Sequence, residues 1–162
     1  MALGTASARG SEVPLGSDSQ AAASTLKVEL KVLFLPSESV ERGNNKYQID
    51  DSSPPPAKIR NRLFAVTFLL AGCQPASDGN CNVTVEYRMI DPTGKPAFVS
   101  ARREAWMGAP IVGDLKPGID GVEAGFDSTD PPGDYRIVIT LFDNVANSRV
   151  SAERTLHLER VD

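Results

Sequence analysis

The sequence predicts an all-β fold, an antiparallel β-sandwich of about seven strands. Three observations support it. Short runs of alternating apolar and polar residues recur between positions 26 and 158, and this alternation is typical of strands with one buried face. Clusters of Pro, Gly, Asp and Asn separate the runs, as turns do. No stretch keeps a helical period of apolar residues for more than about two turns.

Length and composition indicate one globular domain. A chain of 162 residues with 41% hydrophobic and 23% charged residues suits a single folded unit. The net charge is −4, so we expect no nucleic acid as partner. The longest apolar run, Leu63 to Cys73, is shorter than the roughly 20 residues that a membrane-spanning helix needs, so we expect a buried strand and no membrane insertion.

Residues 1–24 are expected to be a disordered tail or the remnant of a leader, and residues 25–162 to form the domain. The N-terminal segment is rich in Ala, Ser and Gly and shows no periodicity. It contains Ala6-Ser7-Ala8, the small-residue pattern of a signal-peptide cleavage site, without the charged start and full apolar core that precede such a site. The segment is therefore either the end of a longer leader or a chance match.

The first predicted strand runs from Leu26 to Phe34 and ends before Pro36. A polar loop over 37–61 follows, with three consecutive prolines and room for a short strand around Tyr47 to Ile49. The second strand, from Arg62 to Leu70, is apolar on both faces. Its inward residues are Phe64, Val66, Phe68 and Leu70, and its outward ones include Leu63, Ala65 and Leu69. Either the 37–61 loop or another protein is expected to cover that outer face.

Five further strands complete the prediction. They are expected at 81–90, 97–103, 122–126, 133–143 and 150–158. The segment around Trp106 and the stretch through Pro117-Gly118 are expected to be irregular. The strongest pattern is the turn Asp130-Pro131-Pro132-Gly133 followed by a strand whose inward row is Tyr135, Ile137, Ile139 and Leu141.

Cys73 and Cys81 lie at the end of one predicted strand and the start of the next. If the two strands form a hairpin, the cysteines lie opposite each other within disulfide range. A reduced pair is the alternative, and a metal site lacks nearby ligands because the one histidine, His157, is distant in the sequence. A disulfide favours an oxidising compartment.

The motif Pro132-Gly133-Asp134-Tyr135, its strand and Asp143-Asn144 resemble the next-to-last strand of immunoglobulin-like domains, which implies that Tyr135 is a tyrosine corner. Residues 60–158 also resemble small secreted bacterial proteins of unassigned function, on the spacing of the cysteines, of Asp91-Pro92-Thr93-Gly94 and of Trp106. That likeness implies a periplasmic or secreted protein and carries no catalytic residues. The chain departs from antibody domains, since its cysteines are too close in sequence to be expected to bridge two sheets.

Catalytic chemistry finds little support in the sequence. There is no Gly-x-Ser-x-Gly motif and no phosphate-binding glycine loop, and we expect no cofactor and no enzymatic activity. Asp127, Asp130 and Asp134 would suit calcium as hard oxygen ligands, or they would simply build the turn.

The sequence therefore predicts a non-enzymatic, exported module that binds another protein, one of the cell envelope. The expected contact residues are Leu63, Leu69, Trp106 and Met107, although Trp106 would equally serve as a lid on the core. A carbohydrate- or calcium-binding module is the alternative function.

Overall fold

The computed structural model of the chain describes residues 25–35 and 58–161. The predicted tail or leader remnant, most of the 37–61 loop and the short strand around Tyr47 to Ile49 lie outside the described residues. No described segment forms a helix long and apolar enough to cross a bilayer.

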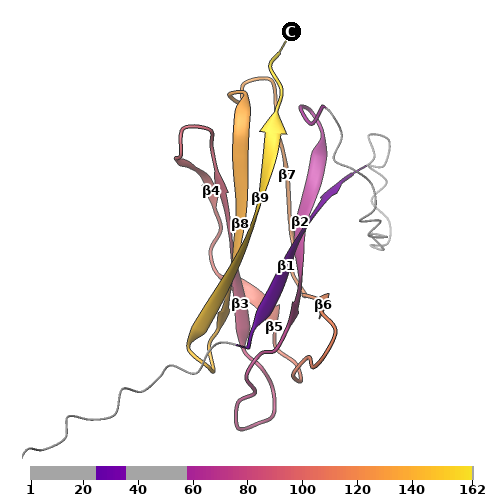
Figure 1. The fold of residues 1–162 in the computed structure, drawn as a ribbon, viewed down its shortest axis with the longest axis vertical. Helices are drawn as coiled ribbons and strands as arrows, with labels where there is room; N and C mark the ends of the chain where they lie inside the picture. The colour runs from indigo at the N-terminus through magenta and orange to yellow at the C-terminus, as the bar shows by residue number, and fades with distance from the viewer. Residues whose placement is uncertain (1–24, 36–57, 162) are drawn as a thin grey trace, which may run out of the picture.

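The described residues form two packed antiparallel sheets, which confirms the predicted β-sandwich (Figure 1). In the first sheet, β2 (Leu63–Ala71) lies between β1 (Lys27–Phe34) on one side and β6 (Lys116–Pro117) and β7 (Val122–Gly125) on the other. In the second sheet the order is β3, β8, β9, and two short strands share the free side of β3. Its strands are β3 (Val83–Ile90), β4 (Pro96–Val99), β5 (Arg103–Trp106), β8 (Gly133–Asp143) and β9 (Ser148–Leu158).

Nine strands are present in the described residues where about seven were predicted. The single strand expected at 97–103 is divided into β4 and β5, because the chain leaves the ladder after Ser100, whose main-chain N–H donates to Tyr87 O at 2.9 Å. The stretch expected to be irregular contains β6, two residues that pair with Leu69 and Leu70.

The core lies between the sheets and follows the predicted inward rows. All four inward residues of β2 and of β8 are buried. In β3 the alternation places Val83, Val85, Tyr87 and Met89 inward, and the first three are buried while Met89 is half-buried. Aromatic rings connect the layers at one end: the Phe126 and Tyr135 centroids lie 4.6 Å apart, and those of Phe64 and Phe126 lie 5.6 Å apart. The alternation in the sequence therefore identifies the packed faces correctly.

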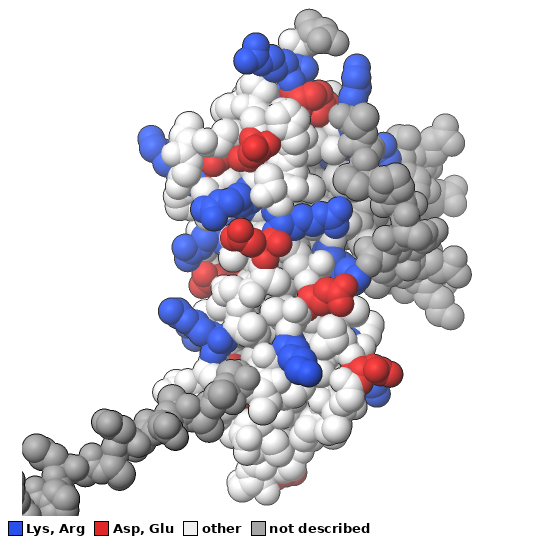
Figure 2. Space-filling model, viewed as in Figure 1, with Lys and Arg blue, Asp and Glu red and all other residues white. Residues whose placement is uncertain are grey.

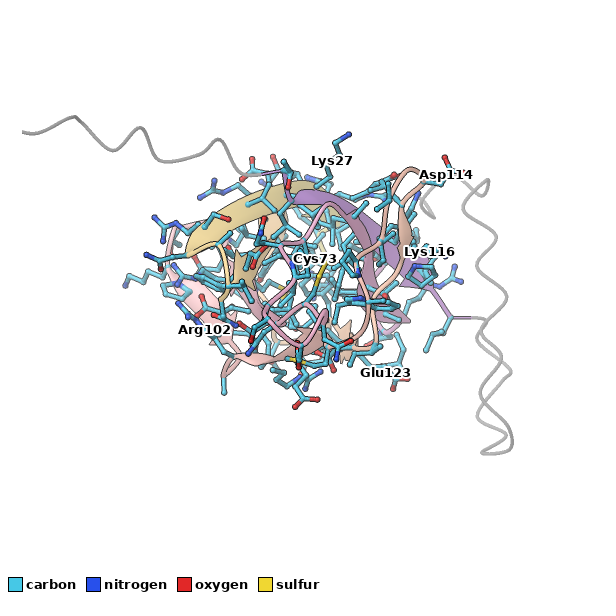
Figure 3. All side chains as sticks on the ribbon, turned by 90° about the horizontal axis from the view of Figure 1, so that it is seen from below. Lys27, Cys73, Arg102, Asp114, Lys116 and Glu123 are labelled. Carbon is cyan, nitrogen blue, oxygen red and sulfur yellow. A yellow bond between two sulfur atoms is a disulfide. The ribbon has the colours of Figure 1, made fainter. Side chains whose placement is uncertain are left out.

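The disulfide between Cys73 and Cys81 is present, but the predicted hairpin is wrong. β2 belongs to the first sheet and β3 to the second, so the connection crosses from one sheet to the other. The bond, with Cα atoms 6.0 Å apart, ties the segment that leaves β2 to the segment that enters β3. Seen from below, its sulfur atoms lie in the interior of the sandwich (Figure 3). Two cysteines close in sequence can therefore join the sheets when they flank a crossover.

Candidate binding crevice between two strand edges

The two sheets are held together along only part of the side where β5 and β7 lie. Next to β5, Ile119 N donates to Ala105 O at 3.0 Å, directly between the sheets. Arg103 adds a two-point ion pair with Asp120, with N–O distances of 2.9 and 2.7 Å, and donates to Gly121 O at 2.7 Å. Charge-assisted bonds of this geometry are strong, so this part of the side is closed.

Beside β4 and β7 the same side is open and contains an apolar crevice of about 180 Å³. β4 and β7 are edge strands of different sheets, and among the described strands nothing pairs with their outer edges. The crevice is lined from both sheets by Phe64, Val66, Tyr87, Arg88, Met89, Phe98, Val122, Glu123, Ala124, Gly125 and Ile137. Apolar concave sites of this kind bind apolar groups of a ligand or partner.

β4 is exposed along its whole length, and its two largest side chains are apolar. Phe98 is 46% exposed and Val99 is 47% exposed. Phe98 pairs with Met89, so the two side chains share the inner face and Phe98 covers the crevice. Val99 pairs with Arg88 and lies on the outer face. The strand therefore presents apolar surface to both sides of an unpaired edge.

Two cations flank β4. Lys95 precedes it, and Arg102 follows it by three residues. Neither side chain forms an ion pair within residues 25–35 and 58–161, although the Arg102 guanidinium lies 3.4 Å from the centroid of the Phe142 ring. On the opposite rim, β7 contributes Glu123, and Figure 3 shows Arg102 and Glu123 on the side of the molecule away from Lys27. Elsewhere, cations and anions are interspersed over the face seen in Figure 2.

Tyr87 is the titratable residue most deeply buried in this region. Burial raises the pKa of Tyr87 well above its usual value of 10, and the nearby Asp120 carboxylate raises it more. Its hydroxyl is buried and makes no hydrogen bond within the described part of the chain. A phenol that resists ionisation in this way is a poor general base.

Leu63 and Leu69, two of the predicted contact residues, lie on the outer face of the first sheet and not in the crevice. Leu63 is 50% exposed and pairs with Gly125 of β7, so it borders the same edge from outside. Leu69 is half-buried between its partners Glu29 and Pro117. The predicted outward orientation of both side chains is confirmed.

Trp106 and Met107 lie at the end of the sandwich near the disulfide, away from the crevice. The Trp106 indole N–H donates to Ala109 O at 2.9 Å, and the ring packs beside Gly108. Trp106 and Met107 are both half-buried. The indole thus fixes the turn that follows β5, which matches the lid role.

The three acidic residues considered for calcium each contact a different partner within the protein. Asp127 accepts hydrogen bonds from the Thr129 main-chain N–H and hydroxyl at 2.7 and 2.6 Å, and the Thr129 hydroxyl is the main reason why the pKa of Asp127 is lowered. Asp130 accepts from Asp127 N at 2.8 Å, and Asp134 lies 2.7 Å from the His157 ring. Among the described residues, no group of three or more His, Cys, Asp or Glu is placed to hold a metal ion.

The Tyr135 hydroxyl donates to Pro131 O at 2.9 Å, which is the contact expected of a tyrosine corner. Beside it lies a group of hydrogen bonds between Glu159 and residues 59–60 that the sequence pattern did not indicate. Glu159 accepts from the main-chain N–H groups of Ile59 and Arg60 at 3.1 and 3.0 Å, and the Arg60 guanidinium donates back to Glu159 O at 2.6 Å. Both features stabilise this end of the sandwich.

Phe98 is the exposed residue of the crevice that the sequence did not single out. The strand containing Phe98 was predicted, and its apolar run Pro96-Ala97-Phe98-Val99 was the available sign of an edge without polar alternation. Comparisons of the sequence with protein-family models and with curated proteins find no match.

Proposed function

We propose that the chain is an immunoglobulin-like module that binds another protein without catalysis. The strand order supports the immunoglobulin-like assignment: β1, β2 and β7 correspond to strands A, B and E of that fold, and β3, β8 and β9 to C, F and G. The Tyr135 bond to the carbonyl of Pro131 supports it further, because the corner occurs at the start of strand F in such domains.

Export to the periplasm or beyond the cell is part of the proposal. The disulfide carries it, since disulfides persist in oxidising compartments and are rare in the reducing cytosol. A partner in the cell envelope follows from that location.

The observation that carries the binding function is exposed Phe98 over an apolar crevice between two unpaired strand edges. Contiguous apolar surface of this kind marks interaction sites, and exposed strand edges are templates for pairing. A sugar-binding surface would present several hydrogen-bonding groups around the ligand. The crevice offers mainly aliphatic and aromatic side chains, with Arg88 and Glu123 as its charged residues, which favours a protein partner.

Photo-crosslinking in the native envelope tests the proposal. A photoreactive phenylalanine analogue replaces Phe98 in one variant, and Thr155 in a matched control on the outer face of β9. We expect a discrete protein adduct from position 98 and none from position 155. Equal labelling at both positions, or no adduct at either, would contradict a specific protein-binding role for this side.

A further inference from the structure

We infer that the outer face of the second sheet binds a phosphate group at Arg102 and Arg149, the two arginines beside Phe142. None of these three residues lines the crevice. Figure 3 shows Arg102 on the opposite side of the sandwich from Lys116, which belongs to the first sheet. The phosphate site is therefore a second surface, and it does not depend on the proposed protein-binding function.

Phe142 of β8 and Arg149 of β9 are cross-strand neighbours on the outer face. They are register partners in a ladder that contains no register shift. Asn144 N donates to Asn82 O at 2.9 Å, so the even-numbered residues of β8 direct their backbone groups toward β3. Phe142 and Arg149 thus form a non-hydrogen-bonded pair, the closer of the two kinds, with Cβ atoms about 5 Å apart. Arg149 is exposed and projects from the same face as the ring.

Arg102 reaches the same ring from the segment that precedes β5. Its guanidinium carbon lies 3.4 Å from the centroid of the Phe142 ring, which is a stacked cation–π contact. Stacking fixes the guanidinium plane and leaves its N–H edge to bind an anion, so little conformational entropy is lost on binding. Thr84, the β3 partner of Phe142, adds a third donor: its hydroxyl accepts from Asn144 Nδ2 at 3.2 Å and keeps its own proton to donate.

The two arginines of the site lack the carboxylate partners that the other arginines of this face have. The N–O distances are 3.1 Å in the Arg88–Glu86 pair and 3.5 Å in the Arg136–Glu153 pair. Arg102 and Arg149 form no ion pair within residues 25–35 and 58–161. A local excess of positive charge therefore lies around one ring of a chain whose net charge is −4.

This donor set fits a phosphate group better than a carboxylate. Guanidinium groups bind phosphate oxygens through paired charge-assisted hydrogen bonds. The donors come from β3, from β9 and from the segment before β5, so they approach from different directions. Tetrahedral oxygens meet donors spread in this way, whereas the two oxygens of a planar carboxylate are satisfied by one guanidinium.

Glu104 is the acidic residue that borders the site. It is the β5 register partner of Thr84, and it forms no ion pair with a described residue. Its carboxylate repels a bound anion, so we expect the Glu104→Gln variant to bind phosphate at least twofold more tightly. Exposed charges are also screened by salt, and the expected Kd is therefore modest, about 1 mM at low ionic strength.

A titration with inorganic phosphate, followed by NMR of the 15N-labelled chain at constant ionic strength, tests the inference. We expect saturable shifts of the Arg102 and Arg149 Nε–Hε signals and of the Thr84 amide signal. Acetate should bind at least fivefold more weakly. Equal shifts at all arginines, equal binding of acetate, or no saturation by about 20 mM phosphate would overturn the inference.

Variants distinguish a built site from general attraction. Arg149→Gln and Arg102→Gln should each weaken phosphate binding at least fivefold. Phe142→Leu should do the same without a change of charge, because the ring that holds Arg102 is gone. Arg136→Gln is the matched control, since it removes the same charge from the same face, and its affinity should stay within twofold. An equal loss in this control, or unchanged affinity in Arg149→Gln, would overturn the site.

Two further probes separate the sources of the phosphate group. Binding of glycerol 3-phosphate, without binding to vesicles that contain phosphatidic acid, would assign the site to a soluble phosphate ester. Co-sedimentation with those vesicles, abolished by Arg149→Gln, would assign it to a lipid headgroup. Absence of both responses would overturn the inference. The photo-crosslink at position 98 is independent of all these results, because that residue lies on the crevice.

Discussion

Opening the Cys73–Cys81 disulfide is expected to lower the free energy of unfolding by about 2.5 kcal/mol. The bond joins residues separated by 8 positions, and the chain-entropy model gives this magnitude for a loop of that length. The two cysteines are 5% and 3% exposed, so their packing in the folded state changes little when the bond is opened. For a domain of about this size, the loss corresponds to a fall in Tm of about 10 °C.

Calorimetry of the protein with and without a phosphine reductant measures this fall, with mass spectrometry confirming that both thiols are free. A Cys73→Ala/Cys81→Ala variant is the control, because the reductant should leave its Tm unchanged. Two main-chain bonds hold the same region independently, from Cys81 N to Gly108 O at 2.8 Å and from Gly72 N to Ile111 O at 3.0 Å. A fall below about 2 °C in fully reduced protein would show that these bonds suffice, and would refute the argument from chain entropy.

Three further changes test the framework of the sandwich. Tyr135→Phe removes the hydroxyl bond of the corner and keeps the ring, so we expect a loss of about 1 kcal/mol in urea unfolding; an unchanged midpoint would argue against the corner. Gly118→Ala places a methyl group 2.1 Å from the Phe68 ring and should cost about 1–3 kcal/mol, whereas Gly108→Ala, with its nearest contact at 3.6 Å, should be nearly neutral. The pKa of Glu159 lies below its usual 4.5 because main-chain N–H groups stabilise the carboxylate more than partial burial destabilises it. The ionised Glu159 side chain therefore contributes its full share to the free energy of unfolding above pH 4.5, and this share is lost as the pH falls through the lowered pKa. We expect the free energy of unfolding of the Glu159→Gln variant to fall less steeply at acidic pH than that of the unchanged protein. An identical acidic pH dependence in both proteins would contradict this.

The sequence predicted the strands well because each has one face against the core. In β8 the predicted inward row of Tyr135, Ile137, Ile139 and Leu141 is buried throughout. In β2 the outward positions except Thr67 are apolar as well, yet the aromatic residues Phe64 and Phe68 identify the core face. Periodicity works here because a shift by one residue would expose the whole row.

The connection between β2 and β3 could not be predicted from the same patterns. A disulfide between Cys73 and Cys81 fits a hairpin, and it equally fits a crossover between sheets whose two ends approach each other, as they do here with Cα atoms 6.0 Å apart. The loop between the cysteines is long enough for either. Pairing partners far along the chain decide between them: β3 pairs with β8 and β2 pairs with β1.

The crevice could not be predicted from the sequence either, because its position depends on where the two packed sheets separate. Phe98 has the spacing of an ordinary inward residue of a strand. Its exposure arises because the Arg103–Asp120 pair closes the sandwich next to β5, while nothing in the described chain closes it beside β4. Trp106, the more conspicuous residue in the sequence, is used inside the fold by its bond to Ala109.

Three features of β4 protect its open edge from indiscriminate pairing. An exposed strand with apolar side chains is an aggregation risk, and proteins limit that risk with short edges, proline and lysine. β4 has four residues, begins with Pro96 and follows Lys95. Shortness limits the number of backbone bonds that a pairing strand could form with β4, and Pro96 lacks a donor. In the proposed protein-binding role, a partner would therefore also need an apolar group that enters the crevice, and selectivity would follow from that requirement.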